Sequence, residues 1–382
     1  MTSQVGLNAL YFILTIKIYD LTRSSTAVSI LLLTFTLPSI FFGYLAGVYV
    51  DQLSLKRVML LTNLARSIIV MLLIFLLNSP VVLLILVFLL ASATLFFVPA
   101  EGAAIPALVG ERRLIAANSL FSLTLQLGIV IGFLAGGFSL SFLGEKVTLF
   151  SIFLLFVLSL LFNLFLPEEI RADIEERKGG MLENFVKGVV FVFSKKIIRD
   201  SIFFLTMSTT IIFILVTIGP GYVDKILQTK VTNASLLIIA PATLGMAIGA
   251  VIIGVAGHRF KERTMVNSGL LTMGLTFLLI AYLSSASFGS TYHILSLILI
   301  LFLGFGNALI TIPVTTDFQK NTPEELRGRA YGILGTFISG VAALPVLISG
   351  ALSDTFGVRT VLIALGIVVL SFCLFRFRRR AL

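Results

Sequence analysis

The sequence predicts an all-α membrane protein with twelve transmembrane helices arranged as two six-helix bundles. The first observation is composition: 58% of the 382 residues are hydrophobic and only 12% are charged, whereas about a quarter charged is usual in soluble domains. The second is a series of apolar runs, each long enough to cross about 30 Å of hydrocarbon. The third is one long polar segment, residues 167–199, with six apolar runs on either side of it.

Helices are expected because a backbone in lipid must satisfy its own hydrogen bonds, which leaves only helices and closed barrels. Barrel strands alternate apolar and polar side chains, whereas residues 81–90 read VVLLILVFLL and do not alternate. The expected spans lie approximately at residues 5–22, 26–50, 58–77, 80–106, 118–140, 147–166, 200–219, 234–257, 265–285, 291–317, 329–350 and 358–376.

The polar segment sets the predicted domain limits. Residues 1–166 form the N-terminal bundle, residues 167–199 a cytoplasmic linker, and residues 200–382 the C-terminal bundle. Within the linker, residues 181–194 have apolar side chains at helical spacing, which predicts an amphipathic helix on the membrane surface.

Lysine and arginine positions predict the orientation. With the linker on one face, that face carries 21 of these residues and the opposite face five, and the richer face is cytoplasmic by the positive-inside rule. We therefore expect a multi-pass protein of the cell (inner or plasma) membrane with both termini in the cytoplasm. The net charge of +10 is explained by these loops, so no nucleic-acid partner is expected.

The sequence lacks the motifs of several metal-binding, nucleotide-binding and catalytic classes. Cys373 is the sole cysteine, so neither a disulfide framework nor a thiolate metal cluster is expected. The sequence has no G-x-x-x-x-G-K-[ST] phosphate loop, no H-E-x-x-H zinc motif and no G-x-S-x-G nucleophile elbow. No cofactor, metal site or enzyme activity is therefore expected. No cleavable signal peptide is expected either, because no basic residue precedes the first apolar run and no small-residue cleavage site follows it. The lipid bilayer is an expected partner.

The most informative motif is a short polar link between the second and third spans. Residues 47–57 read GVYVDQLSLKR and place Asp51, Lys56 and Arg57 between two long apolar runs. So short a link predicts a tight helical hairpin with these charges at one membrane face.

A second copy of the motif lies 207 residues further on, with Gly254, His258, Arg259 and Arg263. A separate set of matching residues, from Pro99 onward and from Pro313 onward, recurs at an offset of 214. Two similar offsets in the same order indicate duplication of a six-span unit. Parallel repeats of this kind place a substrate path between the halves, near the bilayer midplane.

At these residues the chain resembles the major facilitator superfamily. Gly47, Asp51, Lys56 and Arg57 match its loop signature G-x-x-x-D-R-x-G-x-R-R. Gln52 replaces the first arginine of that signature, and a serine replaces its internal glycine. The resemblance implies the facilitator fold and transport by alternating access.

Two further segments resemble export members of that superfamily. Span five carries Gly128, Gly132, Gly136 and Gly137, similar to the glycine motif of its antiporters, although a phenylalanine replaces the motif's proline. Small residues at this spacing permit close helix contact, which the resemblance implies is a hinge or seal between the halves. Residues 323–330, PEELRGRA, resemble a loop of the bacterial efflux branch that includes macrolide and enterobactin exporters.

The polar positions have alternative interpretations. Asp51 is interpreted as a gate latch that caps a neighbouring helix, or else as a turn residue. His258 replaces the aspartate in the second copy, either as a pH-sensitive latch or as a lost charge. Arg66 and Glu101 lie within adjacent spans, where charges are costly and normally paired or functional, so they form a static ion pair or Glu101 exchanges a proton. Asp20, on one helix face with Lys17, is a weaker candidate for binding protons or cationic substrates.

We therefore expect a monomeric secondary active transporter that exports hydrophobic or amphipathic small molecules (drug, macrolide or siderophore-like), with proton antiport. The 34 phenylalanines and absence of tryptophan favour an apolar, aromatic cavity. Alternatives are a gradient-independent facilitator, a lipid-type transporter, a non-transporting membrane scaffold and a membrane enzyme. The first span is expected to be short at its cytoplasmic end or to start late.

Overall fold

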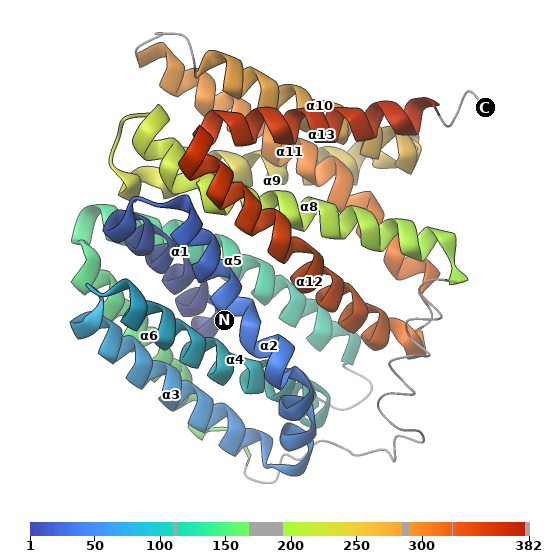
Figure 1. Cartoon of the computed structure of the whole chain (residues 1–382). Helices are drawn as coiled ribbons and strands as arrows, with labels where there is room; N and C mark the ends of the chain where they lie inside the picture. Colours follow the sequence, from blue (N-terminus) through green and yellow to red (C-terminus); the bar gives the residue numbers. More distant parts are fainter. Residues whose placement is uncertain (110–113, 168–193, 285–289, 323, 379–382) are drawn as a thin grey trace. The chain divides into compact units, whose positions relative to one another are not determined.

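A computed structural model describes residues 1–109, 114–167, 194–284, 290–322 and 324–378, with the side chains of residues 43–52, 258 and 324–333 among those outside the description. In these ranges the chain forms twelve long α-helices (Figure 1). They are α1 (Thr2–Thr22), α2 (Ser25–Gln52), α3 (Leu55–Leu76), α4 (Pro80–Val109), α5 (Leu114–Leu143), α6 (Glu145–Leu164), α8 (Lys196–Gly221), α9 (Ala240–Ala256), α10 (Glu262–Leu283), α11 (Ser290–Asn321), α12 (Glu324–Phe356) and α13 (Val358–Arg378).

The predicted all-α, twelve-helix membrane fold is confirmed. Eleven helices in the described ranges are long and apolar enough to cross a membrane. The twelfth, α2, is 28 residues long, and its part Ser25–Ser39 qualifies as a shorter apolar helix. A helix satisfies most of its backbone hydrogen bonds within the segment, as a lipid solvent requires, although α2, α8, α11 and α12 each contain an internal proline, which has no N–H to donate.

The chain divides into two compact units. The first comprises Met1–Arg23 and Ile30–Arg177, and the second comprises Ser24–Ser29 and Lys178–Leu382. In the first unit α1 packs against α5 and α6, and α3 packs against α4 and α6. In the second, α11 packs against α8, α9 and α10, while α13 packs against α10 and α12. The predicted limits at 166 and 199 stay predictions, and the predicted surface helix at 181–194 lies almost entirely outside the described residues.

Two tight turns recur in equivalent places of the two units. Gly144 alone links α5 to α6, and Gly357 alone links α12 to α13. Both have positive φ, 80° and 86°, a backbone region that glycine enters without a steric penalty. The two glycines are 213 residues apart, close to the offset of 214 in the sequence, which agrees with the inferred duplication of a six-helix unit.

The packing of α3 on α4 fixes the position of the buried polar residues described below. Leu55, Val58 and Met59 of α3 are buried against Phe97 and Ala100 of α4. Because these α3 residues recur every three or four positions, they form one helix face. That face continues along α3 into a polar stretch.

Candidate functional site

The most deeply buried charge among the described residues is Arg66 of α3. Its side chain is 1% exposed, and it lies on the same face of α3 as the apolar residues that pack against α4. Its Nε donates to Thr94 Oγ1 at 3.2 Å, and its Nη1 donates to Ser3 Oγ at 2.9 Å and to Asn63 Oδ1 at 3.3 Å. Neutral oxygens from α1, α3 and α4 therefore hold the guanidinium in one orientation.

Two phenyl rings also face the guanidinium of Arg66. Its guanidinium carbon lies 4.2 Å from the centroid of the Phe97 ring and 5.9 Å from that of Phe156. A desolvated cation over an aromatic face gains about 2 kcal/mol. The rings and the three acceptors together offset part of the cost of burying a charge.

Glu101 of α4 is connected to this cluster indirectly. Across the described residues no ion pair joins Glu101 to Arg66 within 4.0 Å. Instead Glu101 Oε2 accepts a hydrogen bond from Gln4 Nε2 at 3.3 Å. Gln4 follows Ser3, the residue that contacts Arg66, so the first turn of α1 bridges the cation and the carboxylate. The expected direct ion pair is replaced by a bridged arrangement, and a proton-exchange role for Glu101 stays a prediction.

The glycines of α5 allow α1 to lie where Ser3 and Gln4 reach Arg66 and Glu101. A Cβ on Gly128 would lie 2.8 Å from Gln4 Cβ, one on Gly132 would lie 2.6 Å from Asn8 Cβ, and one on Gly136 would lie 2.9 Å from Ala9 Cα. Real side chains do not approach so closely, so α5 needs glycine at these positions.

The close contact expected from the glycine spacing is therefore present, and it lies inside the first unit, between α5 and α1. Gly137 is buried as well. The role of a seal between the halves stays a prediction.

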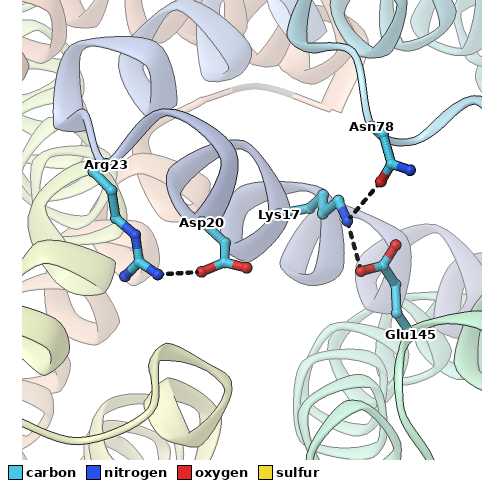
Figure 2. A network of polar contacts seen from close by, with 5 residues as sticks. All are labelled: Lys17, Asp20, Arg23, Asn78 and Glu145. Atoms are coloured by element: carbon cyan, nitrogen blue, oxygen red, sulfur yellow. Dashed lines mark hydrogen bonds and ion pairs between the residues drawn. The ribbon is translucent and has the colours of Figure 1, made fainter.

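A separate ionic cluster lies at the other end of α1 (Figure 2). Lys17 Nζ lies 2.8 Å from Glu145 Oε2 and donates to Asn78 Oδ1 at 3.4 Å. Asp20 instead pairs with Arg23, three residues on, at 2.8 Å. The side chain of Asp20 is 55% exposed, and an exposed pair of this kind contributes little. Its role in binding protons or substrate stays a prediction.

A polar contact that the sequence did not predict joins the start of α2 to α12. Asp354 accepts hydrogen bonds from the hydroxyls of Ser24 and Thr26 at 2.6 and 2.7 Å, and from the backbone amides of Ser25 and Thr26 at 2.8 and 2.9 Å. The aspartate thus caps the amino end of α2 from another helix, where a negative charge is favoured. We call these four residues the α2–α12 clasp. The contact lies within the second unit, which includes Ser24–Ser29.

The clasp also requires close approach of the two helices. A Cβ on Gly350 would lie 2.7 Å from Ser29 Oγ and 2.8 Å from the carbonyl oxygen of Ser25. Two signals in the sequence could have indicated this contact: a serine–threonine run before an apolar stretch is a helix-start pattern, and Asp354 is the one carboxylate between the predicted spans at 329–350 and 358–376. Neither signal by itself gives the partner.

Comparison with known proteins decides the family. The sequence profile of the Major Facilitator Superfamily matches residues 1–345. The chain belongs to the major facilitator superfamily. This is a family of transporters and not a class of enzymes.

Similar facilitators are found among bacterial proteins. The chain is 28% identical to the uncharacterized MFS-type transporter YfmI of Bacillus subtilis, over 98% of this chain and 93% of that protein. It is 25% identical to the multidrug efflux pump Tap of Mycolicibacterium fortuitum, over 91% of this chain and 85% of that protein. Among solved structures, the nucleoside transporter NupG superposes with a TM-score of 0.77 at 14% identity, covering 99% and 96% of the two chains; that likeness supports the fold alone.

The facilitator loop motif is described only in part. α2 ends at Gln52 and α3 begins at Leu55, but the side chains of Gly47, Asp51 and Gln52 lie outside the described residues. Lys56 is half-buried and Arg57 is exposed. The gate latch at Asp51 therefore stays a prediction.

The second copy of the motif spans the end of α9 and the start of α10. A Cβ on Gly254 would meet no atom within 4 Å, and Arg259 is exposed. Arg263 donates from Nη2 to the carbonyl oxygen of Arg376 at 2.8 Å, which ties α10 to the end of α13. The side chain of His258 lies outside the described residues, so its role as a pH-sensitive latch stays a prediction.

Proposed function

We propose that this facilitator exports hydrophobic or amphipathic small molecules from the cytoplasm by alternating access, driven by proton antiport. Two observations support export: one relative bears the name multidrug efflux pump, and the glycines of α5 resemble the antiporter motif. The abundance of phenylalanine favours apolar substrates of the drug, macrolide or siderophore-like kind.

The observation that carries proton coupling is the bridged cluster of Arg66, Ser3, Gln4 and Glu101. Arg66 is held by neutral groups and rings, so its position does not depend on the charge of Glu101. Glu101 is half-buried and accepts a hydrogen bond of 3.3 Å from the amide of Gln4. A carboxyl group in this setting gains and loses a proton without dismantling the cluster, and each change alters the attraction between α4 and α3. In the proposed cycle Glu101 carries the proton. Arg66 is the fixed cation, and its attraction to Glu101 depends on whether Glu101 is charged.

The proposed setting is the cell membrane, with the protein acting as a monomer and both termini in the cytoplasm, because 21 lysines and arginines lie on the predicted inner face against five on the outer. Asp51 is proposed as the latch of the cytoplasmic side. Helix-end electrostatics of this kind contribute about 0.3–2 kcal/mol, enough to bias the cycle and small enough for substrate binding to overcome.

The test is efflux of ethidium and of a labelled macrolide from cells that express the protein, with and without an uncoupler. Efflux above the empty-vector level that stops when the gradient collapses is the expected result. Glu101→Gln is expected to abolish the gradient dependence while the protein stays in the membrane. Glu145→Gln is the matched control, because it neutralises another partly buried carboxylate of the first unit, one engaged with Lys17.

The other outcomes separate the alternatives. Efflux that persists unchanged with the uncoupler would support a gradient-independent facilitator. If no substrate in a broad panel distinguishes expressing cells from empty-vector cells, a scaffold becomes the better interpretation. Gradient-dependent efflux by Glu101→Gln at the wild-type rate would remove Glu101 from the coupling mechanism.

A further inference from the structure

The second unit contains an apolar cavity of about 660 Å³ between α8, α12 and α13. In Figure 1, α12 and α13 leave their shared turn at Gly357 and diverge, with α8 passing between them in the view. Nineteen residues line the cavity, and all but Arg199, Thr206, Thr210 and Ser349 are apolar. A cavity of this size accommodates a molecule of some hundreds of daltons.

The cavity is elongated along α8. Its lining on that helix extends from Arg199 to Ile214, which corresponds to about 22 Å at 1.5 Å per residue. One leaflet contributes about 15 Å of the hydrocarbon thickness. The cavity is therefore longer than one leaflet is thick, and an acyl chain that enters from one membrane face fits along it.

The sides of the cavity contact the surroundings of the bundle. Val341 and Ile348 of α12 are 51% and 54% exposed, and Val368 of α13 is 64% exposed, and all three line the cavity. These exposed apolar side chains make the side of the cavity apolar. A lipid tail can enter laterally without crossing a polar barrier.

One of the lining residues, at one end of the cavity, is charged. Arg199 lines it, lies in the first turn of α8 and is exposed. Among the described residues no carboxylate lies within ion-pair distance of it. The positive end of the α8 dipole points the same way, and the positive-inside rule places this end at the cytoplasmic face. An exposed arginine above an apolar cavity complements an anionic head attached to a hydrocarbon tail.

We propose that this cavity binds one anionic phospholipid of the cytoplasmic leaflet, with an acyl chain between α8, α12 and α13 and the phosphate on Arg199. The cytoplasmic leaflet is the one that presents anionic headgroups to basic residues. A resident chain would fill the space where α12 and α13 separate and thereby fix the angle between them. The inference rests on the orientation given under the proposed function, but the proposed lipid is distinct from the exported molecule.

The test uses the full-length protein in nanodiscs of phosphatidylcholine with a minority of phosphatidylglycerol, and counts retained lipids by native mass spectrometry. The wild type is expected to retain one phosphatidylglycerol in preference to phosphatidylcholine. Arg199→Ala is expected to lower phosphatidylglycerol affinity about tenfold, because it removes a charge-assisted contact with the phosphate. Lys261→Ala removes one exposed positive charge at the same predicted face of the same unit and is expected to leave retention unchanged.

A second pair of variants tests the tail. Val368→Phe places a larger side chain in the cavity and is expected to abolish retention. Ile367→Phe makes a similar change at the adjacent exposed position, which does not line the cavity, and is expected to behave as the wild type. Equal retention of both lipids, or equal phosphatidylglycerol retention by wild type, Arg199→Ala and Val368→Phe, would overturn the proposal. Displacement of the retained lipid by ethidium at its transport concentration would also overturn it, because the cavity would then belong to the transported molecule.

Discussion

At the scale of single residues, Arg66 shows how a charge is accommodated in a membrane-spanning bundle when no carboxylate of the described residues lies within ion-pair distance of it. Three neutral oxygens and two phenyl rings surround it. Removal of the Arg66 side chain is expected to destabilise the fold, because the surrounding acceptors lose their donor and a cavity remains between the rings.

Arg66→Ala is therefore expected to destabilise the first unit by about 3 kcal/mol. Thermal unfolding in detergent checks this as a lowered Tm. Arg57→Ala is the matched control, because Arg57 is an exposed arginine near the start of the same helix; its Tm is expected to stay within a degree or so of the wild type. Equal Tm values for the two variants would mean that the cluster around Arg66 contributes no stability.

At the scale of helices, the α1–α5 contact depends on the absence of side chains. Gly132→Ala would place Cβ 2.6 Å from Asn8 Cβ and 2.7 Å from the carbonyl oxygen of Val5, so α1 must move. The expected cost is about 1–3 kcal/mol of overpacking. Gly340→Ala makes the same change in α12 with open space around it, so the difference in Tm between the two variants isolates the clash.

Displacing α1 is also expected to disturb the bridge from Ser3 and Gln4 to Arg66 and Glu101. If Gly132→Ala unfolds at the same temperature as Gly340→Ala and transports normally, the close contact is dispensable.

The α2–α12 clasp belongs to the same scale, because one side chain holds the first turn of another helix. Asp354→Ala removes all four hydrogen bonds that its carboxylate accepts, and leaves two amides at the start of α2 without a partner. We expect a loss of about 1.5–3 kcal/mol, observed as a lower Tm and faster proteolysis in the loop that precedes α2. Thr355→Ala is the control, because the exposed Thr355 hydroxyl donates to the backbone of its own helix. Equal Tm values and equal rates of proteolysis for the two variants would mean that the clasp contributes no stability.

At the scale of the whole molecule, twelve spans and the asymmetry of basic residues predict a definite topology. A fluorescent-protein fusion after Leu382 is expected to fluoresce, since that reporter folds in the cytoplasm. An alkaline phosphatase fusion after Asn78, which follows the third span, is expected to be active because that reporter requires the outer compartment. The opposite pair of results would invert the orientation and with it the direction assigned to transport.

The fold was predictable from the sequence because lipid leaves few choices. Apolar runs of membrane length must be helices, and the polar segment at 167–199 separates six from six. The motif around Asp51 and its second copy also indicated the family, since signatures of this kind are local in the sequence. The spacing of glycines in α5 likewise predicted a close helix contact, because small residues at intervals of four share one face.

The partners of the polar residues were decided only by the tertiary structure. Charges at Arg66 and Glu101 suggested a direct pair, but Ser3 and Gln4 bridge them because α5 holds α1 close to α3 and α4. Lys17 and Asp20 share a helix face and yet bind different partners, because Glu145 begins α6 and Asn78 lies in the link between α3 and α4, and the sequence does not place either segment next to α1. The local sequence determines which segments are helical and which face of each helix is apolar. Contacts between residues 97 or 330 positions apart depend on how the helices pack.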